Sequence, residues 1–398
     1  MASLPDGEPA PQDGSLPNPD ISAGFSAYVH IPFCSVRCGY CDFNTYTNPN
    51  FGPGAGLTDF PDSLAREIAL SRRVLEGNGR IKTVFFGGGT PTMLDSAQLV
   101  AVLGDLKATF GLAANAEITT EANPESVTPE SLRELAAGGF TRVSFGMQSA
   151  VPRVLSILDR QHRPSRVPQV VRWAREAGLE VSLDLIYGAP GETDVEWRAS
   201  LEAALTLEPD HISAYALTVE PGTKMGGQVR RGETSLPDPD MQADRYEMAA
   251  AMLEPAGYHW YEISNWARPG HECAHNLAYW RGSDWWGYGP GAHSHICGTR
   301  FWNVKHPLAY ANRLLDGASP AAARELLSAT ERAEETIMLG IRLAEGIPVP
   351  AATGREVIAG LISDELVDPA SAFSGTLRLT LRGRLLADSV TRALWQDL

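Results

Sequence analysis

Along most of the chain, short runs of β-branched and aromatic residues alternate with longer amphipathic stretches. The short runs have the composition of buried strands, and the stretches between them have the periodicity and length of helices. A regular alternation of strand and helix is typical of a parallel sheet with helical crossovers. We expect six strands, at residues 27–31, 83–86, 117–120, 142–145, 181–186 and 211–216.

One predicted helix shows both of its ends in single residues. Thr128 is a favourable N-cap, Pro129 fits the first helical turn, and Glu130 places an acid at the positive end of the helix dipole. Gly138 then ends the helix, as glycine often does. These signals support the helical crossovers that a parallel sheet requires.

Polar and glycine-rich residues come at the ends of the predicted strands. The motif GGGTP, residues 87–91, follows the second strand, Glu121 the third and Gln148 the fourth, and Asp184 lies in the fifth. A single residue of this kind is usually part of a turn or cap. Strand ends in a parallel barrel share one rim, however, where active sites form. A closed barrel has eight strand–helix units, whereas this sequence predicts six. We therefore expect an incomplete (β/α)6 barrel that is open at one side to a large ligand.

The pattern changes beyond residue 240. A helical stretch leads into an irregular aromatic and glycine-rich segment, followed by two helices and a strand, turn and helix at residues 375–394. We therefore expect a partial barrel at 25–240 and a smaller α+β, winged-helix-like domain at 241–398. Residues 1–24 are rich in Pro, Asp and Gly, and we expect a flexible tail there, because such a segment buries too little apolar surface to offset its ordering entropy.

Composition narrows the class of protein. With 398 residues and 43% hydrophobic residues, the chain can build a sizeable core. No apolar run approaches the roughly 18 residues of a membrane span, and the first residues lack the features of a secretory signal. We expect a cytoplasmic protein that meets any membrane-bound partner only peripherally. The net charge of −15 argues against a nucleic-acid surface, so a winged-helix-like domain would pack or bind a partner protein.

Three of the five cysteines, Cys34, Cys38 and Cys41, lie within the segment HIPFCSVRCGYCDF. A disulfide framework suits small secreted domains, not a long chain with an odd cysteine count. Zinc usually takes two closely spaced pairs, and Cys273 and Cys297 are far apart. An iron-sulfur cluster accepts thiolates from one compact loop, and three of them leave one iron open. We favour the cluster, with zinc as the weaker alternative.

Four segments carry a resemblance to a known family: YVHIPFCSVRCGYCDF, FFGGGTPTML, SFGMQS and LDLIYGAPGET. They resemble the radical S-adenosylmethionine (radical SAM) superfamily. Their combination is similar to the branch that contains oxygen-independent coproporphyrinogen III oxidase and the HemW family of heme chaperones. The resemblance covers nearly the whole chain beyond about Tyr28. It implies a partial barrel that carries a [4Fe-4S] cluster and binds S-adenosyl-L-methionine (SAM).

The resemblance also assigns roles to single residues. Cys34, Cys38 and Cys41 would ligate the cluster, whose open iron would chelate the amino and carboxylate groups of SAM. The residues implied for SAM itself are Tyr28 and Tyr40 around the cosubstrate and cluster, Gly88, Gly89 and Thr90 at its methionine end, Glu121 and Arg160 at its ammonium and carboxylate groups, Gln148 and Asp184 at the ribose hydroxyls, and Tyr215 and Ala216 beside the adenine. Arg160 could instead lie at a solvated helix end without a role in SAM binding. A carboxylate buried at Asp184 would need a ligand or a charge partner.

Two positions separate the members of this branch. The oxidases carry a further cysteine two residues after the third, where this chain has Phe43, and the motif HNLAYW, residues 275–280, resembles the HNxxYW motif of the heme chaperones. There His275 is a candidate axial ligand of heme iron, although it could also be a structural histidine in an aromatic core. Tyr279, Trp280, Trp285 and Trp286 could cover a porphyrin face. We expect no metal at the neighbouring His271 and Cys273.

Two functions follow from the resemblance. The first is a heme chaperone that binds heme and delivers it to apoproteins, such as respiratory hemoproteins, without need of catalysis. The second is an oxygen-independent coproporphyrinogen III oxidase of porphyrin biosynthesis, in which SAM cleavage yields a 5′-deoxyadenosyl radical. Phe43 and the HNLAYW motif favour the chaperone, so we lean against an enzyme.

Overall fold

Residues 6–395 are described by a computed structural model of the chain. Its centre is a run of six parallel strands that pair in the order of the sequence. All six expected strands are confirmed, most of them extended by a few residues. They are β2 (Phe25–Ile31), β3 (Ile81–Gly88), β4 (Leu112–Ala122), β5 (Arg142–Gln148), β6 (Glu180–Tyr187) and β7 (His211–Ala216).

The parallel run does not close on itself. The free edge of β2 pairs with β10 (Trp285–Tyr288), and the free edge of β7 pairs with β9 (Asn265–Ala267). Further antiparallel strands extend both sides into a thirteen-stranded sheet. They are β8 (His259–Glu262), β11 (His293–Ile296), β12 (Thr299–Asn303), β13 (Ala321–Leu326) and β1 (Glu8–Pro9). The six parallel strands therefore do not form a closed barrel, and the expected opening to a large ligand stays a prediction.

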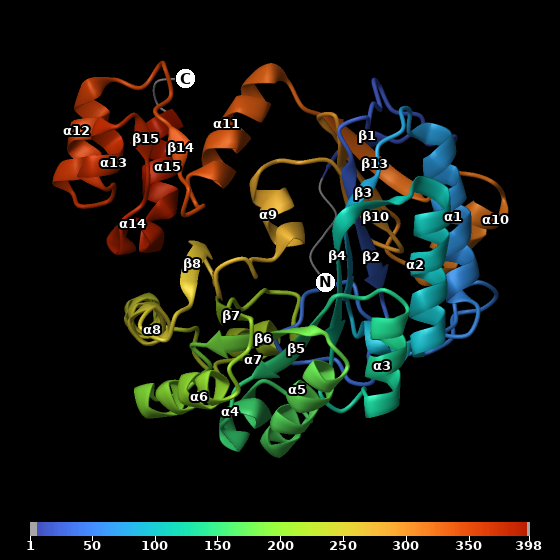
Figure 1. Cartoon of the computed structure of the whole chain (residues 1–398), viewed down its shortest axis with the longest axis horizontal. Coiled ribbons are helices and arrows are strands. Elements are labelled where there is room, and N and C mark those ends of the chain that lie inside the picture. Colours follow the sequence, from blue (N-terminus) through green and yellow to red (C-terminus); the bar gives the residue numbers. More distant parts are fainter. Residues whose placement is uncertain (1–5, 396–398) are drawn as a thin grey trace.

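Helices follow the outer, convex side of the curved strands (Figure 1). The expected cap at Thr128 is confirmed, because its side chain accepts a hydrogen bond from the Ser131 backbone N–H at 3.1 Å. The outer helices are α1 (Phe60–Val74), α2 (Ser96–Phe110), α3 (Pro129–Ala137), α4 (Pro152–Ile157), α5 (Val167–Glu176), α6 (Asp194–Thr206) and α8 (Pro239–Leu253). In contrast, α9 (Ala274–Trp280) lies on the inner side, against β3.

The N-terminal segment packs against the sheet. β1 pairs with β13, Leu16 is partly buried, and Ile21 is fully buried in the main core. Over residues 6–24 the structure thus differs from the flexible tail expected for residues 1–24, and residues 1–5 lie outside the described part. The reason is physical: two apolar anchors lie among the prolines and glycines, and an average over the composition hides them.

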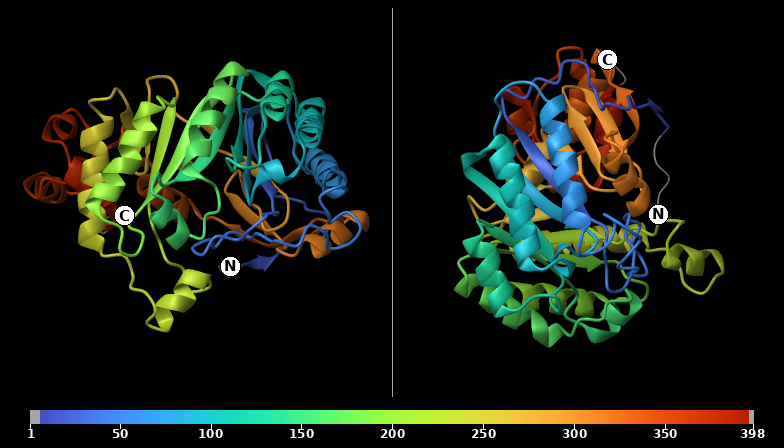
Figure 2. Two further views of the ribbon diagram at one scale, coloured as in Figure 1. Left: turned by 90° about the horizontal axis from the view of Figure 1, so that it is seen from below. Right: turned by 90° about the vertical axis from the view of Figure 1, so that its right-hand side faces the viewer.

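A second, smaller core lies near the C-terminus, far from α1 and α2 (Figure 2). It is built from α11 (Ala329–Gly340), α12 (Arg355–Ser363), α13 (Pro369–Phe373), α14 (Leu381–Leu385), α15 (Ala387–Trp395) and the strand pair β14 (Ile347–Pro348) and β15 (Thr376–Leu377). The strands of residues 259–326 belong instead to the main sheet. The division expected at residue 240 therefore falls nearer α11 in the structure. The winged-helix character of this unit stays a prediction.

A buried carboxyl group joins the two sides of the main core. Glu67, on α1, is fully buried and accepts hydrogen bonds from the Gly289 backbone N–H at 2.8 Å, Asn303 Nδ2 at 2.7 Å and the Tyr310 hydroxyl at 2.5 Å. Burial raises the pKa of Glu67 to about 7, although the three hydrogen bonds oppose this rise. Glu67 thus links α1 to β12 and to α10 (Pro307–Leu315).

We expect Glu67 to make stability depend on pH. Its folded-state pKa of about 7 lies above the ordinary value of 4.5, so its contribution to the free energy of unfolding is full below about pH 4.5 and decreases as the pH rises through 7. The whole contribution is on the order of 3 kcal/mol at most. Thermal unfolding of Glu67→Gln should show a smaller loss of stability between pH 5 and 8 than the wild type, whereas Glu76→Gln, at an exposed acid, should not. An unchanged pH dependence in Glu67→Gln would contradict the assignment.

Candidate functional site

A cavity of about 510 Å³ lies at the carboxyl ends of the parallel strands. Cys34, Cys38, Cys41 and His275 all line it. So does every residue that the resemblance implies for SAM: Tyr28, Tyr40, Gly88, Gly89, Thr90, Glu121, Gln148, Arg160, Asp184, Tyr215 and Ala216. The structure therefore brings together residues that span nearly 250 positions of the chain.

The cysteine loop connects β2 to α1, and each of its three free thiols has a polar neighbour. The Thr90 hydroxyl lies 3.8 Å from Cys34 Sγ, and Arg160 Nη1 lies 3.5 Å from Cys38 Sγ. The Thr45 hydroxyl lies 3.8 Å from Cys41 Sγ. Burial raises the pKa of Cys34 to about 11 and also raises that of Cys41. These donors suit sulfur atoms that carry negative charge when they bind a metal.

The donor set fits a polynuclear cluster. Among residues 6–395, no three Cys, His, Asp or Glu side chains converge on a single ion. In an iron-sulfur cubane each thiolate binds its own iron, so the thiols need not converge on one point. The three free thiols lie on one loop and line one cavity, and each is near a hydrogen-bond donor. Each thiol could therefore bind a different iron of one cluster.

The GGGTP motif lies against the cysteine loop at a distance that leaves no space for side chains. Gly88 has φ +106°, and a Cβ atom there would lie 2.4 Å from His30 Nδ1. A Cβ atom on Gly89 would lie 2.5 Å from the Phe33 carbonyl oxygen and 3.0 Å from Cys34 Sγ. Backbone hydrogen bonds from Gly89 to Ile31 and from Thr90 to Phe33, both 2.8 Å long, fix this approach. The glycines are required here for both conformation and space.

Gly39, in the cysteine loop, also lies where a side chain would collide with a neighbour. Its φ is not in the left-handed region. A Cβ atom on Gly39 would instead lie 2.5 Å from Asp159 Oδ2, which also pairs with Lys224 at 2.7 Å. Close packing of the loop against the end of α4 therefore explains the glycine.

Two half-buried carboxyl groups form part of the cavity wall. Glu121 accepts a hydrogen bond from the Gly88 backbone N–H at 3.2 Å. Asp184 accepts one from the Ser213 hydroxyl at 2.9 Å and one from the Ser144 hydroxyl at 3.0 Å. Burial raises the pKa of Glu121 to about 8, with a further contribution from the Asp184 charge, and burial also raises the pKa of Asp184. A bound cation would be favoured here, because it would stabilise both ionised forms.

Ser144 and Ser213 were missed by the sequence reasoning. They lie on β5 and β7, the strands on either side of Asp184 in β6, and Ser213 pairs directly with Asp184 in the sheet. Serine is common in ordinary turns and strands, so its type carried no signal. The register of β6 and β7 could have indicated Ser213, which pairs with Asp184, whereas Ser144 pairs with Ser182 and is not at the level of Asp184.

Arg160 and Gln148 each leave a polar atom without a partner. Arg160 donates to the Gly146 carbonyl oxygen at 2.9 Å, but its Nε is buried and makes no hydrogen bond within residues 6–395. Gln148 has φ +60°, and its Oε1 is likewise buried without a partner in the described chain. Arg160 is therefore not a solvated helix end. Unpaired buried polar atoms that line a cavity indicate a ligand.

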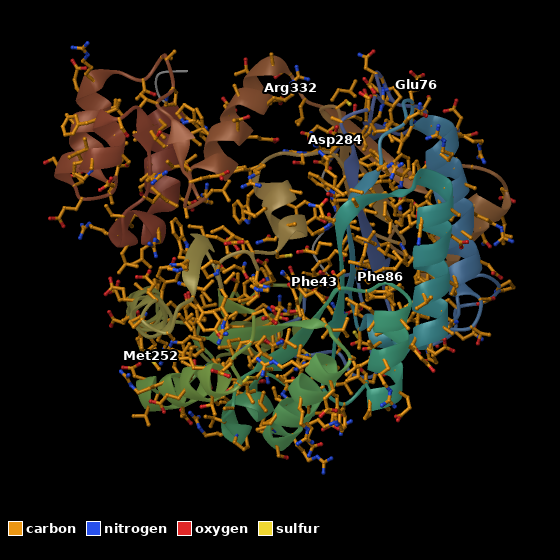
Figure 3. All side chains as sticks on the ribbon, in the orientation of Figure 1. Phe43, Glu76, Phe86, Met252, Asp284 and Arg332 are labelled. Carbon is orange, nitrogen blue, oxygen red and sulfur yellow. The ribbon has the colours of Figure 1, made fainter. Side chains whose placement is uncertain are left out.

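Aromatic residues form the remaining walls. Tyr28 donates a hydrogen bond to His30 Nδ1 at 3.1 Å, and its ring stacks 6.4 Å from that of Phe85. Tyr40 packs with an apolar group at α4. Phe43 is 61% exposed although it lines the cavity, and Figure 3 shows it near the middle of the molecule. An apolar ring is thus presented at the mouth of the cavity, where the resembling oxidases carry a cysteine.

Glu117 holds the helix of the HNLAYW motif in place. From β4 it accepts hydrogen bonds from the backbone N–H groups of Ala274 at 2.9 Å and His275 at 3.0 Å, at the start of α9. It also accepts one from Cys273 Sγ at 3.4 Å and lies 3.4 Å from Arg142. A carboxylate in this position satisfies free N–H groups and favours the helix dipole. The sequence alone did not suggest this role.

His275 is 2% exposed, and both of its ring nitrogens have partners. Nδ1 lies 2.7 Å from the Thr83 hydroxyl, which itself donates to Ser26, so Nδ1 carries the proton and Thr83 accepts it. Nε2 accepts from the Tyr279 hydroxyl at 2.9 Å. Burial lowers the pKa of His275 to about 3, which keeps the ring neutral. Its lone pair is therefore on Nε2, on the side of Tyr279.

The four aromatic residues expected to cover a porphyrin do not share one face. Trp286 is buried in the main core against Phe301, with ring centroids 4.9 Å apart. The rings of Trp285 and Tyr279 pack together, with centroids 4.8 Å apart. Trp280 lines a second cavity. Trp285 and Trp286 separate because successive residues of a strand point to opposite sides of the sheet.

Comparison with known proteins identifies the family. The model of the radical SAM superfamily matches residues 28–204. The heme chaperone HemW of Mycobacterium tuberculosis is 48% identical over 373 residues, which cover 93% of this chain and 94% of that protein. The heme chaperone HemW of Bacillus subtilis is 34% identical, over 94% of this chain and all (100%) of that protein.

A solved structure supports the fold. The coproporphyrinogen III oxidase HemN of Escherichia coli, described as a radical SAM enzyme, superposes with a TM-score of 0.80, at 24% identity over 94% of this chain and 91% of that chain. This likeness shows a shared fold. The extent and identity of the matches to the curated relatives go further, and by them the chain belongs to the HemW family within the radical SAM superfamily.

Proposed function

We propose that this protein is a heme chaperone, which binds heme and delivers it to apo-hemoproteins. The observation that carries this function is the 48% identity, over 93% of the chain, to a protein named heme chaperone HemW. Phe43, at the position of the additional cysteine in the resembling oxidases, supports it. We further propose that the clients include respiratory hemoproteins. None of the helices within residues 6–395 combines the length and the apolar character of a membrane span. We also propose peripheral contact with any membrane-bound client.

The cluster and SAM would share the large cavity. Cys34, Cys38 and Cys41 would hold a [4Fe-4S] cluster, which when bound supplies an open iron for the amino and carboxylate groups of SAM. The closely packed glycines leave the backbone of residues 88–90 accessible to the methionine end. Glu121, with its raised pKa, would become fully ionised beside the cationic cosubstrate.

The other polar residues of the cavity would orient SAM. Arg160 has a free Nε and would meet the carboxylate, while Gln148 has a free Oε1 and would accept a hydrogen bond from a ribose hydroxyl. Asp184 is already oriented by two serine hydroxyls and can accept a second ribose hydrogen bond. The exposed Ala216, at the end of β7, would border the adenine.

We also propose His275 as an axial ligand of heme. Neutral imidazole is a common ligand of heme iron, and Nε2 of His275 carries the lone pair. The Tyr279 hydroxyl occupies that lone pair, so ligation requires this hydroxyl to move away. Because His275 lines the same cavity as the residues implied for SAM, heme at His275 and SAM would compete for one space of about 510 Å³.

A second candidate function is an oxygen-independent coproporphyrinogen III oxidase. The shared fold with HemN favours it. Both functions use the same cluster, so the detection of iron does not distinguish them. The winged-helix-like assignment of the C-terminal unit, and a partner-binding role for it, remain proposals under either function.

Replacement of Cys38 should abolish the cluster. Cys38→Ser removes one of three thiolates, and the anaerobically reconstituted variant should lose visible absorption and contain iron and sulfide near background. Cys297→Ser is the matched control, because Cys297 lies outside the cavity, in the turn between β11 and β12. Iron and sulfide at wild-type levels in Cys38→Ser would refute the ligand assignment.

Hemin titration should reveal the role of His275. We expect His275→Ala to weaken hemin binding roughly tenfold or more, because an iron–imidazole bond is lost. Tyr279→Phe removes the hydrogen bond that occupies Nε2, worth about 1 kcal/mol, and should tighten binding about fivefold. SAM should weaken binding in the wild type. Identical hemin affinity in the wild type and His275→Ala would remove His275 from this role.

An assay of turnover separates the two functions. The protein is reconstituted without oxygen and mixed with reductant, SAM and coproporphyrinogen III. We expect no multiple-turnover formation of protoporphyrinogen, because a chaperone has no need to abstract hydrogen from the propionate side chains. Substantial multiple-turnover product would overturn the chaperone function and establish the oxidase.

A further inference from the structure

A second cavity, of about 300 Å³, lies between the main sheet and the C-terminal unit. It is bordered by the end of α9, by β11 and by α11 with the turn that follows it. Leu339, Leu343 and Ile347 form an apolar wall, and Trp280, His295 and Arg332 complete it. None of these six residues lines the large cavity.

His295 offers an unoccupied ring nitrogen. Its Nδ1–H donates to the Ser283 carbonyl oxygen at 3.4 Å and lies 3.8 Å from Asp284 Oδ1. Nε2 therefore carries the lone pair, and it makes no hydrogen bond to any residue from 6 to 395. Burial lowers the pKa of His295, so the ring is neutral. A histidine whose second nitrogen donates to a backbone carbonyl has an arrangement found in metal-ligating histidines.

His295 and His275 differ in the hydrogen-bond partners of their ring nitrogens. Both nitrogens of His275 are hydrogen-bonded, to Thr83 and Tyr279. In His295 one nitrogen is hydrogen-bonded and the other has no partner in the described part of the chain, and the residue lines the second cavity. Of these two histidines, His295 needs no displacement of a protein group before it can bind iron.

Arg332 provides an unpaired positive charge near His295. It is exposed on α11, and its side chain makes no ion pair or hydrogen bond with the residues that the structure describes. The other charged residues of the cavity are paired: Arg281 with Glu345 at 2.9 Å, and Glu335 with Arg300. Figure 3 labels Arg332 and Asp284 in the upper part of the molecule.

The Arg332 side chain lies against Gly298. A Cβ atom added to Gly298, in the turn between β11 and β12, would lie 2.8 Å from Arg332 Nη1. The charge therefore lies over the same hairpin that carries His295 in β11. A free guanidinium at the rim of an apolar cavity is suited to a carboxylate, which it can bind through two parallel hydrogen bonds.

Trp280 supplies a flat apolar surface. It is the last residue of the HNLAYW motif and is half-buried. Its ring makes no aromatic contact with another ring of residues 6–395. A large ring without an aromatic partner, next to aliphatic side chains, is available to stack on a planar ligand.

We propose that this second cavity is a heme-docking site, in which His295 Nε2 binds the iron, Arg332 pairs with a propionate and Trp280 packs against the porphyrin. The inference rests on the proposed heme chaperone function and adds a site to it. Coordination involves no transfer of electrons or protons, because the imidazole is already neutral and Nε2 donates its lone pair to the iron.

The size and place of the site suit transfer. A cavity of about 300 Å³ is at the lower limit of those that enclose a small-molecule ligand, so one edge of the heme would stay exposed to a client. The helix α9 contributes His275 and Tyr279 to the large cavity and Trp280 to the second one. Heme bound at His295 would not compete with SAM, whereas heme bound at His275 would.

Hemin titration of the anaerobically reconstituted full chain tests the site. We expect two equivalents in the wild type, of which His295→Ala loses one, and added imidazole should restore the spectrum of ligated heme in that variant. Arg332→Gln should weaken the same equivalent roughly tenfold, because it loses a charged pair. His259→Ala and Arg355→Gln, at exposed positions outside both cavities, are the matched controls. SAM should leave the His295-dependent equivalent unchanged.

The outcomes separate the site from the function. If the wild type binds no hemin, the proposed function fails. If the wild type binds hemin and both His295→Ala and Arg332→Gln bind it with wild-type affinity, stoichiometry and spectrum, this site fails while the function stands. A single equivalent that persists in His275→Ala but is lost in His295→Ala supports the site. If His295→Ala unfolds, Arg332→Gln decides, since its side chain is exposed and makes no contact on which folding depends.

Discussion

The close approach between the end of β3 and the cysteine loop is the constraint on which the site depends. Gly88 and Gly89 bring the backbone of one strand end so near to His30, Phe33 and Cys34 that a single Cβ atom would displace the loop. This contact holds Cys34 at the rim of the parallel strands, and all three thiols of the loop line the cavity. The other groups that line the cavity are positioned relative to this rim.

Electrostatics then gives the cavity its selectivity. Two half-buried carboxyl groups, Glu121 and Asp184, line the cavity, and desolvation raises the pKa of each, so that their ionisation is unfavourable until a cation binds. Arg160, with one unpaired nitrogen, supplies the opposite charge within the same wall. A ligand with both an ammonium and a carboxylate group would satisfy all three, which is a stricter requirement than charge of one sign.

The short helix α9 connects this cavity to the second one. Glu117 anchors its first turn from β4, so the helix is fixed to the sheet at one end, while its last residue reaches the cavity beside the C-terminal unit. The motif HNLAYW therefore does not act as one binding surface. Its side chains divide between two spaces because a helix directs residues one position apart to different faces.

Much of this could be predicted from the sequence, for identifiable reasons. Strand positions followed from β-branched runs, and the rim residues followed from their place after those runs, which is a property of parallel sheets. Ser144, Ser213 and Glu117 were missed because their roles depend on which strand or helix lies opposite, information that no local pattern carries. The flexible tail expected at the N-terminus was not found over residues 6–24, because two apolar residues, Leu16 and Ile21, pack against the core. An average over the composition does not detect such single residues.

We propose that three thiolates hold a cubane whose fourth iron faces a SAM-binding cavity. The most direct measurement is the electron paramagnetic resonance spectrum of the reduced, anaerobically reconstituted protein with and without SAM. We expect the signal of a reduced [4Fe-4S] cluster whose g values shift when SAM is added, because SAM would bind the open iron itself. A spectrum that SAM leaves unchanged, or a preparation with bound zinc and no inorganic sulfide, would contradict it.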